Sequence, residues 1–228
     1  MVPGTFMSIV GKPAPNILYI GNAGENIGSG GTGVTVTYNA SSAAGDFLLL
    51  FAQCDDGSSI STPSGWTKYA SGSVSPYCKG YIFYKFKTTD TTVFVQQTSN
   101  QTNCSVLTFR NVDTTSPINV GAGKLGNEGS TTRTFPDITT TVDGCFYLAA
   151  YFHDWPNASN TAASSWTNAN IASGTELLDI STTADWDGGV AVWGGYKNTA
   201  GACGATTVVH ADSAAANILE QALALTPA

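Results

Sequence analysis

The side chains that could perform catalysis are few and widely separated in this sequence. There are only two histidines, His153 and His210, and a serine or cysteine triad would require one of them beside a nucleophile and an acid. No G-x-S-x-G elbow occurs, and His153 and Asp154 are neighbours on a predicted loop edge. The five cysteines occur singly, without the close Cys and His spacing of a zinc site. We therefore expect a protein that is not an enzyme and holds no cofactor. The alternative of a secreted hydrolase would need His153 or His210 to be essential for turnover.

The acidic residues do not form a recognisable site either. Asp55-Asp56-Gly57-Ser58 is similar to part of a calcium loop but lacks the alternating ligands and the closing glutamate, so we interpret it as a turn between strands. Glycoside hydrolysis would need two carboxylates in one cleft, and the spacing of the four glutamates singles out no pair: Glu25, Glu128, Glu176 and Glu220.

Two tryptophans flanked by acids are the best candidates for binding. Trp155 follows Asp154 in a predicted loop, and Trp186 lies between Asp185 and Asp187 in another. Exposed aromatic rings beside hydrogen-bonding acids can stack on sugar rings and bind their hydroxyls, so Asp154, Trp155, Trp186 and Asp187 form a candidate glycan-binding set. The alternative is that both indoles fold back and cap the ends of the domain. Trp66 and Trp166, in similar turn sequences, are interpreted as core or end-cap residues.

The composition limits the class of protein that presents these residues. The 228 residues suit one all-β domain, and only 11% of them are charged, with a net charge of −7. No group of Lys or Arg exists to bind phosphates, which excludes nucleic acid as a partner. The longest apolar run, Phe47 to Ala52, is too short to cross a bilayer, and the first residues lack the pattern of a signal peptide.

The five cysteines leave two interpretations open. Burial as reduced thiols is one. The other is one or two disulfides, with Cys54 and Cys104 as the first candidate pair because both lie in or beside apolar strand segments.

Short strands separated by turns fill the chain after an extended N-terminal arm. Residues 1–30 are rich in Pro and Gly, which predicts an arm with at most one short strand near residues 17–20. Residues 31–228 are predicted to form a single β-sandwich, jelly-roll-like in character. Its strands are expected at residues 34–38, 47–52, 81–86, 92–97, 105–110, 146–152, 190–196, 206–210 and 218–225.

The two halves of this domain are similar in sequence. GDFLLLFAQCDDGSS and PSGWT are echoed by DGCFYLAAYFHDWPN and SSWT, with Leu48 and Leu148 offset by 100, as are Trp66 and Trp166. We interpret this as an internal duplication with repeats at about 34–118 and 131–228, each of four or five strands. Neither repeat has enough core to be stable alone, so the two should pair in one sandwich.

Several motifs resemble those of a known group of proteins. GDFLLLF, PSGWT, YIFYKF, VLTFRNVDTTSPI and the terminal ALALTP are together similar to small β-sandwich virion proteins of tailed bacteriophages, over about residues 34–225. The resemblance implies a virion protein assembled in the host cytoplasm, either a capsid decoration (cement) protein or a tail or fibre module that binds the host surface. We favour decoration because the sequence lacks a long trimeric stalk.

The resemblance also implies partners. These are the major capsid or tail protein, a host-surface glycan for the alternative role, and a second copy of the chain if it forms a homo-oligomer. The candidate assembly arm consists of apolar residues spaced among Pro and Gly that could order on a neighbouring subunit: Phe6, Ile9, Ile17, Tyr19 and Ile20.

Overall fold

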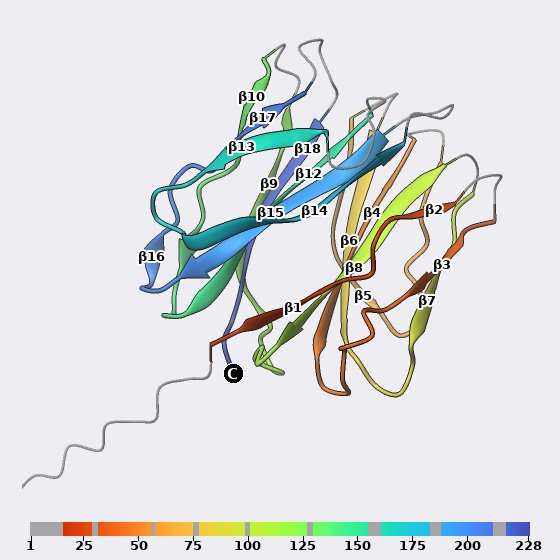
Figure 1. The fold of residues 1–228 in the computed structure, drawn as a ribbon, viewed down its shortest axis with the longest axis horizontal. Helices are drawn as coiled ribbons and strands as arrows, with labels where there is room; N and C mark the ends of the chain where they lie inside the picture. The colour runs from red at the N-terminus through yellow and green to blue at the C-terminus, as the bar shows by residue number, and fades with distance from the viewer. Residues whose placement is uncertain are drawn as a thin grey trace, which may run out of the picture.

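Two large antiparallel β-sheets pack face to face across the centre of the molecule (Figure 1). The structure is a computed structural model and describes residues 16–28, 32–55, 58–74, 78–98, 101–126, 130–154, 161–182, 188–211 and 218–228. All regular elements in these residues are β-strands, which confirms the predicted all-β sandwich; the jelly-roll-like connectivity stays a prediction.

Each large sheet comes from one half of the chain. The first sheet has the order β1-β8-β4-β6-β5, with β2 also beside β8: β1 (Leu18–Asn22), β2 (Asn26–Gly28), β4 (Phe47–Cys54), β5 (Thr67–Val74), β6 (Cys78–Phe86) and β8 (Thr102–Arg110). The second has the order β14-β15-β12-β18-β9: β9 (Ile118–Gly126), β12 (Cys145–His153), β14 (Ala172–Thr182), β15 (Gly188–Lys197) and β18 (Ile218–Leu225).

Smaller sheets cover the outer faces of the large ones. β3 (Val34–Thr37) pairs with β7 (Thr92–Val95) over the first sheet. Over the second lie β10 (Thr132–Thr134), β17 (Thr207–His210) and β13 (Ala163–Thr167), in that order. A short pair, β11 (Thr139–Thr140) and β16 (Gly201–Ala202), lies in the same half. The sequence did not predict these extra outer layers.

Three hydrophobic cores lie between the four layers. In β4, Phe47, Leu49 and Phe51 enter the central core between the large sheets. Their neighbours Leu48 and Leu50 enter the first outer core, beneath β3 and β7. A second outer core lies between the second sheet and β10, β17 and β13. The unbroken apolar run of β4 predicts a strand covered on both faces, and the structure confirms this.

The strand order shows that the two halves are similar. The order β8-β4-β6-β5 in the first sheet corresponds to β18-β12-β15-β14 in the second. The edge strand beside β8 is β1, and the edge strand beside β18 is β9; likewise β3–β7 corresponds to β10–β17. β1 and β9 lie before the predicted repeats at 34 and 131, so each repeat is longer than the sequence indicates. The terminal strand β18, which matches β8, is confirmed as a strand.

The predicted register between the halves is wrong by one residue. Leu48 enters the first outer core whereas Leu148 enters the central core, so an offset of 100 matches residues on opposite faces. Pairing Phe47 with Phe146 restores the correspondence, because both side chains enter the central core. A slip of one residue reverses every side chain of a strand, and a sequence match between two apolar runs cannot detect it.

The predicted N-terminal arm is partly strand. Residues 18–28 include β1 and β2, which both pair with β8. Ile17 is fully buried in the central core, and the Tyr19 ring contacts Phe109. Ile17 is therefore buried, and Tyr19 partly buried, by contacts within their own chain. Residues 1–15 lie outside the described residues.

Candidate functional site

The candidate glycan-binding set flanks the end of β12 and the start of β15 in the sequence. Asp154 is half-buried and directly follows β12, whose last residue, His153, pairs with Gly189 near the start of β15. The described residues next to segments 155–160 and 183–187 therefore lie on adjacent strands of the second sheet. Of the four predicted residues only Asp154 is described, because Trp155, Trp186 and Asp187 lie outside the described residues.

A buried polar network joins the two halves at this end. The Asn103 Nδ2 atom donates to the Gly188 carbonyl oxygen at 2.8 Å and to Gln53 Oε1 at 3.2 Å. A Cβ atom on Gly188 would collide with the Gln53 amide, and its φ of +150° also favours glycine. Asn103 of the first sheet is therefore hydrogen-bonded to the start of β15 in the second sheet.

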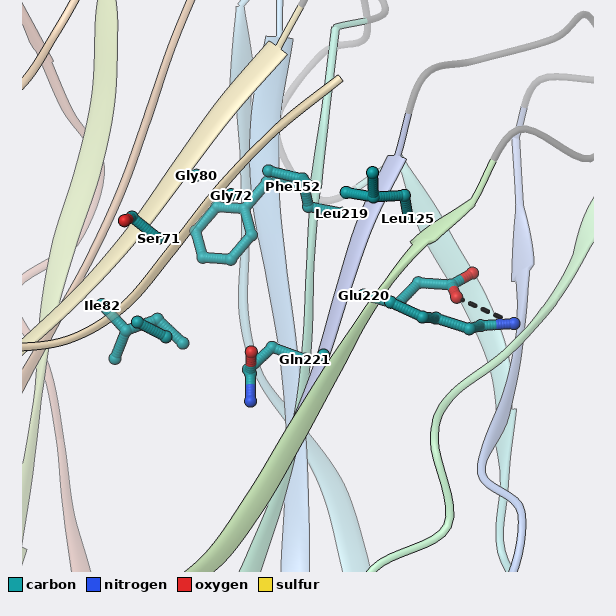
Figure 2. A pocket seen from close by; sticks show the side chains of 12 residues that line it. Ser71, Gly72, Gly80, Ile82, Leu125, Phe152, Leu219, Glu220 and Gln221 are labelled. Carbon is teal, nitrogen blue, oxygen red and sulfur yellow. Dashed lines mark ion pairs between the residues drawn. The ribbon is translucent and has the colours of Figure 1, made fainter.

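A pocket of about 300 Å³ lies between the halves where the two sheets reach their edges (Figure 2). β5 and β9 are the last strands of their sheets on this side. The ion pair of Lys124 Nζ with Glu220 Oε2, 3.0 Å apart, lies on the opposite face of β9 and β18. Phe152 and Leu219 form an apolar wall of the pocket. Leu125 beside them has 62% of its surface exposed. The pocket can receive an apolar group.

The structure brings the two histidines together, which the sequence did not predict. The ring centroids of His153 and His210 are 5.2 Å apart, and the Tyr151 ring lies 5.5 Å from each. The two histidines meet because β12 and β17 lie on opposite sides of the second outer core. Both rings are buried, at 0% and 1% exposure. They cannot reach a substrate in this conformation.

Three carboxylates line a second concave region of about 290 Å³ near Asn22. They are Glu25, Glu176 and Asp179. The two glutamates are among the four considered from the sequence, and Asp179 is not. Burial, with a further contribution from Glu176, raises the pKa of Asp179 to about 6, although the Ala163 backbone N–H donates to it at 3.1 Å. Glycoside hydrolysis needs two carboxyl groups that reach the sugar. Asp179 is only 3% exposed and does not meet this requirement.

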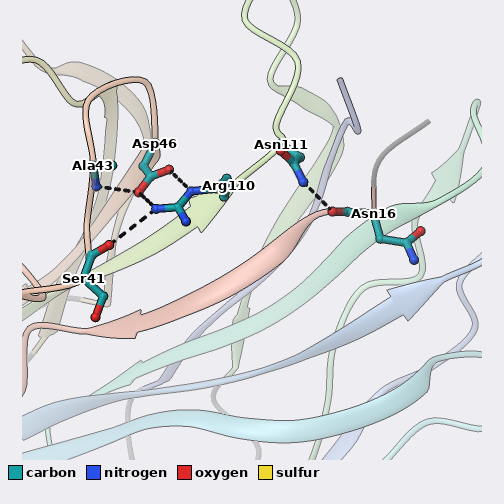
Figure 3. A network of polar contacts seen from close by, with 6 residues as sticks. All are labelled: Asn16, Ser41, Ala43, Asp46, Arg110 and Asn111. Carbon is teal, nitrogen blue, oxygen red and sulfur yellow. Dashed lines mark hydrogen bonds and ion pairs between the residues drawn. The ribbon is translucent and has the colours of Figure 1, made fainter.

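The motifs that carry the resemblance support the fold. Asp46 of GDFLLLF accepts from both Nε and the second terminal nitrogen of Arg110, each at 2.8 Å (Figure 3). Asp113, in the same motif as Arg110, accepts from the backbone N–H groups of Thr115 and Ser116. These contacts close the turn before β4 and the turn after β8.

Trp66 and Trp166 pack against the outer cores, in agreement with their interpretation as core or end-cap residues. Trp66 of PSGWT is 7% exposed and packs in the first outer core. Trp166 packs against the second outer core, and its Nε1 donates to Glu176 Oε2 at 2.8 Å.

The described part of the candidate assembly arm contacts its own chain. The Tyr196 hydroxyl donates to the Ile17 carbonyl at 2.8 Å, and the Tyr19 hydroxyl donates to the Leu177 carbonyl at 3.2 Å. Ile20 is half-buried on β1. Phe6 and Ile9 lie outside the described residues.

The cysteines are buried thiols. All five are described, and none is joined in a disulfide. Cys54 and Cys104 lie on neighbouring strands, but their register partners are Thr102 and Ala52, so the two residues do not face each other. This geometry agrees with the first of the two interpretations.

Comparisons with known proteins identify no relative. The chain matches no protein family, no curated protein and no solved structure.

Among the described residues no three His, Cys, Asp or Glu side chains gather as metal ligands, and no helix there has the length and hydropathy to cross a membrane.

Proposed function

We propose that this chain is a non-enzymatic structural protein of a tailed-phage virion that decorates the capsid shell. The observation that carries the proposal is the exposed Leu125 beside the pocket between the edges of both large sheets. The resemblance of the motifs to virion proteins supports it. The major capsid protein is the expected partner.

The side of the molecule formed by β5 and β9 is suited to docking on another protein. Terminal strands present backbone N–H and C=O groups that can pair with a further strand. Leu125 is the most exposed of the large apolar side chains among the described residues. A pocket beside it, walled by Phe152 and Leu219, can receive an apolar side chain. A low-charge surface also immobilises few flexible side chains on assembly.

The number of copies on purified particles tests the proposal. Quantitative mass spectrometry should give a simple ratio to the major shell protein. Leu125→Asp places a charge on the docking side and should reduce the bound copies about tenfold or more. Val142→Asp is the control, because Val142 is also exposed, at 38%, but lies in the turn before β12. Full occupancy by L125D, or absence of the wild-type protein from particles, would reject the proposal.

A tail or fibre module that binds host carbohydrate is the second candidate. The observation that favours it is the pairing of His153, at the end of β12, with Gly189 of β15, because the candidate residues flank these two positions in the sequence. Trp155→Ala and Trp186→Ala should then abolish retention on host polysaccharide with little loss of stability. Unchanged retention in both variants, with only a few copies per particle, would leave this role without support.

A further inference from the structure

Three glycines line the pocket between the edges of the two large sheets (Figure 2). Gly72 of β5 and Gly80 of β6 belong to the first sheet, and Gly123 of β9 belongs to the second. A Cβ atom on Gly72 would lie 2.9 Å from a methyl group of Leu219, and one on Gly80 would lie 2.5 Å from the Phe152 ring. A larger residue at either position would therefore take up space that the pocket now provides.

The internal repeat shows that the fold does not require two of these glycines. In the register that aligns the central core of the two halves, Gly80 corresponds to Val190. Their neighbours on the adjacent edge strands, Gly72 and Ile180, also correspond. Val190 and Ile180 are both buried in the central core. The second half therefore fills with side chains the space that the first half leaves open.

Most of the side chains that face the pocket are apolar. Phe152 and Leu219 come from the second sheet, and Ala70 and Ile82 come from the first. Leu125 lies at the exposed edge. An apolar cavity of about 150 Å³ can accept benzene, so a pocket of about 300 Å³ has room for an aromatic system of one or two rings.

Gln221 supplies a hydrogen-bond acceptor on the inner face of the second sheet. Successive residues of a strand point to opposite faces, so Gln221 shares the face of Leu219, while Glu220 points to the outer face. The Gln221 Nε2 atom donates to the Ala222 carbonyl oxygen at 3.1 Å, which holds the amide in place. Among the described residues no group donates to its Oε1 atom, so a ring that carries an N–H or O–H group can do so.

We propose that this pocket receives the ring of a tryptophan or tyrosine side chain of the major capsid protein, and that the N–H or O–H group of the ring donates to Gln221 Oε1. An aromatic side chain buries a large apolar area at a small cost in conformational entropy, and Phe152 provides a second ring for it to contact. A phenylalanine or leucine side chain would fill the same space but has no donor for Gln221. The identity of the partner rests on the proposed function, and the chemistry of the ring does not.

Titration of the full chain with indole tests the chemistry of the ring. The NMR signals of the Leu125 and Leu219 methyl groups should shift in a saturable manner. Gly72→Val should weaken indole binding about tenfold or more with little change in the urea midpoint, because the second half carries Ile180 at this position. Ser71→Val is the matched control, because it adds the same side chain at the next residue of β5, which points to the opposite face of the strand.

A second comparison isolates the hydrogen bond to Gln221. Wild-type protein should bind indole more tightly than 1-methylindole, which has no N–H group to donate. The ratio of the two affinities should fall about threefold or more in Gln221→Met, because the thioether is a weak acceptor. This variant also keeps the inference testable if G72V does not fold.

Three results would overturn the inference: no saturable shift in the wild-type protein, indole bound by folded G72V as tightly as by wild type, or an affinity ratio that Q221M leaves unchanged.

The number of copies on purified particles tests the partner separately. G72V and L125D should both reduce the bound copies, and S71V should not. Reduced occupancy for L125D alone would support decoration and reject the entry of a ring into the pocket. Indole binding by a protein that is absent from particles would reject the major capsid protein as the partner and support the ring chemistry.

Discussion

Replacing Asp46 by asparagine should show how strongly the Asp46–Arg110 pair stabilises the first sheet. The Asp46 side chain is 3% exposed, and Arg110 holds it through two nitrogen–oxygen contacts of 2.8 Å. A third contact, 2.7 Å from the Ala43 backbone N–H, fixes the turn before β4 (Figure 3). Asparagine can keep the Ala43 contact, but it loses the charge and one of the two bonds to Arg110.

The expected cost of this change is about 2 kcal/mol. A hydrogen bond to a charged group contributes about 1.5–3 kcal/mol, and the 40% exposure of the Arg110 side chain places the value at the low end because water screens the charge. For a chain of this size, that loss lowers the melting temperature by about 4–8 °C.

The pH dependence separates the ion pair from packing. Burial would raise the pKa of Asp46, but the hydrogen bonds from Arg110 and Ala43 outweigh it and lower the pKa below the ordinary carboxyl value. The ion pair therefore stabilises the fold fully above that ordinary value, and this stability is lost as the pH falls through the lowered pKa. The difference between wild type and D46N should be full at pH 7 and shrink in acid.

Urea unfolding at pH 7 and at about pH 3 measures both quantities. Asp143→Asn is the control, because Asp143 lies in the turn before β12 of the second half, is exposed and accepts a hydrogen bond from the Ala200 backbone N–H. If D46N costs no more than D143N at pH 7, or if its cost is the same at both pH values, the reasoning about the ion pair is wrong.

Three further predictions concern buried groups. Asp179→Asn should stabilise the protein by about 1–2 kcal/mol at pH 7.5 and not at pH 4. Burial raises the pKa of Asp179 to about 6, so the stability of the wild-type protein falls as the pH rises from about 4 to 6. Equal urea midpoints for the two proteins at pH 7.5 would contradict this. Gly80→Ala should cost about 2 kcal/mol in thermal unfolding, because its Cβ would lie 2.5 Å from the Phe152 ring. Burial raises the pKa of Cys104 to about 12, and all five cysteines are buried, so a thiol-specific dye at pH 8 should react with almost none before unfolding and with all five after it.

Strands with a strong apolar pattern could be predicted from the sequence. β4 and β12 have long apolar runs, and the structure contains both of them. β9 has the sequence INVGAGKLG, in which the glycines weaken the strand signal. β14 begins with five exposed residues, ASGTE, before its buried part, so it has no single period. Pairing with β18 and β15 forms these strands, and such contacts are not local in sequence.

Exposed apolar side chains and the candidate sites were harder to predict for the same reason. In the sequence, Phe94 is one more apolar residue of a predicted strand. Only the positions of Val93 and Val95 in the core show that its side chain points outward. Leu125 is exposed because β9 is a terminal strand, and strand order is not visible in a single sequence. The meeting of His153 and His210 depends on the packing of the outer layer over the second sheet.

The distribution of the motif residues limits what their resemblance can say about function. Asp46, Arg110 and Trp66 belong to the quoted motifs, and each forms contacts that hold the first half together. Any protein with this fold needs such contacts, whatever it binds, so these motifs indicate the fold far more strongly than the role. Phe94 and Leu125 lie outside the quoted motifs, and both side chains are exposed rather than packed in a hydrophobic core. Substitution of Leu125 therefore tests the proposed docking with little effect on the fold.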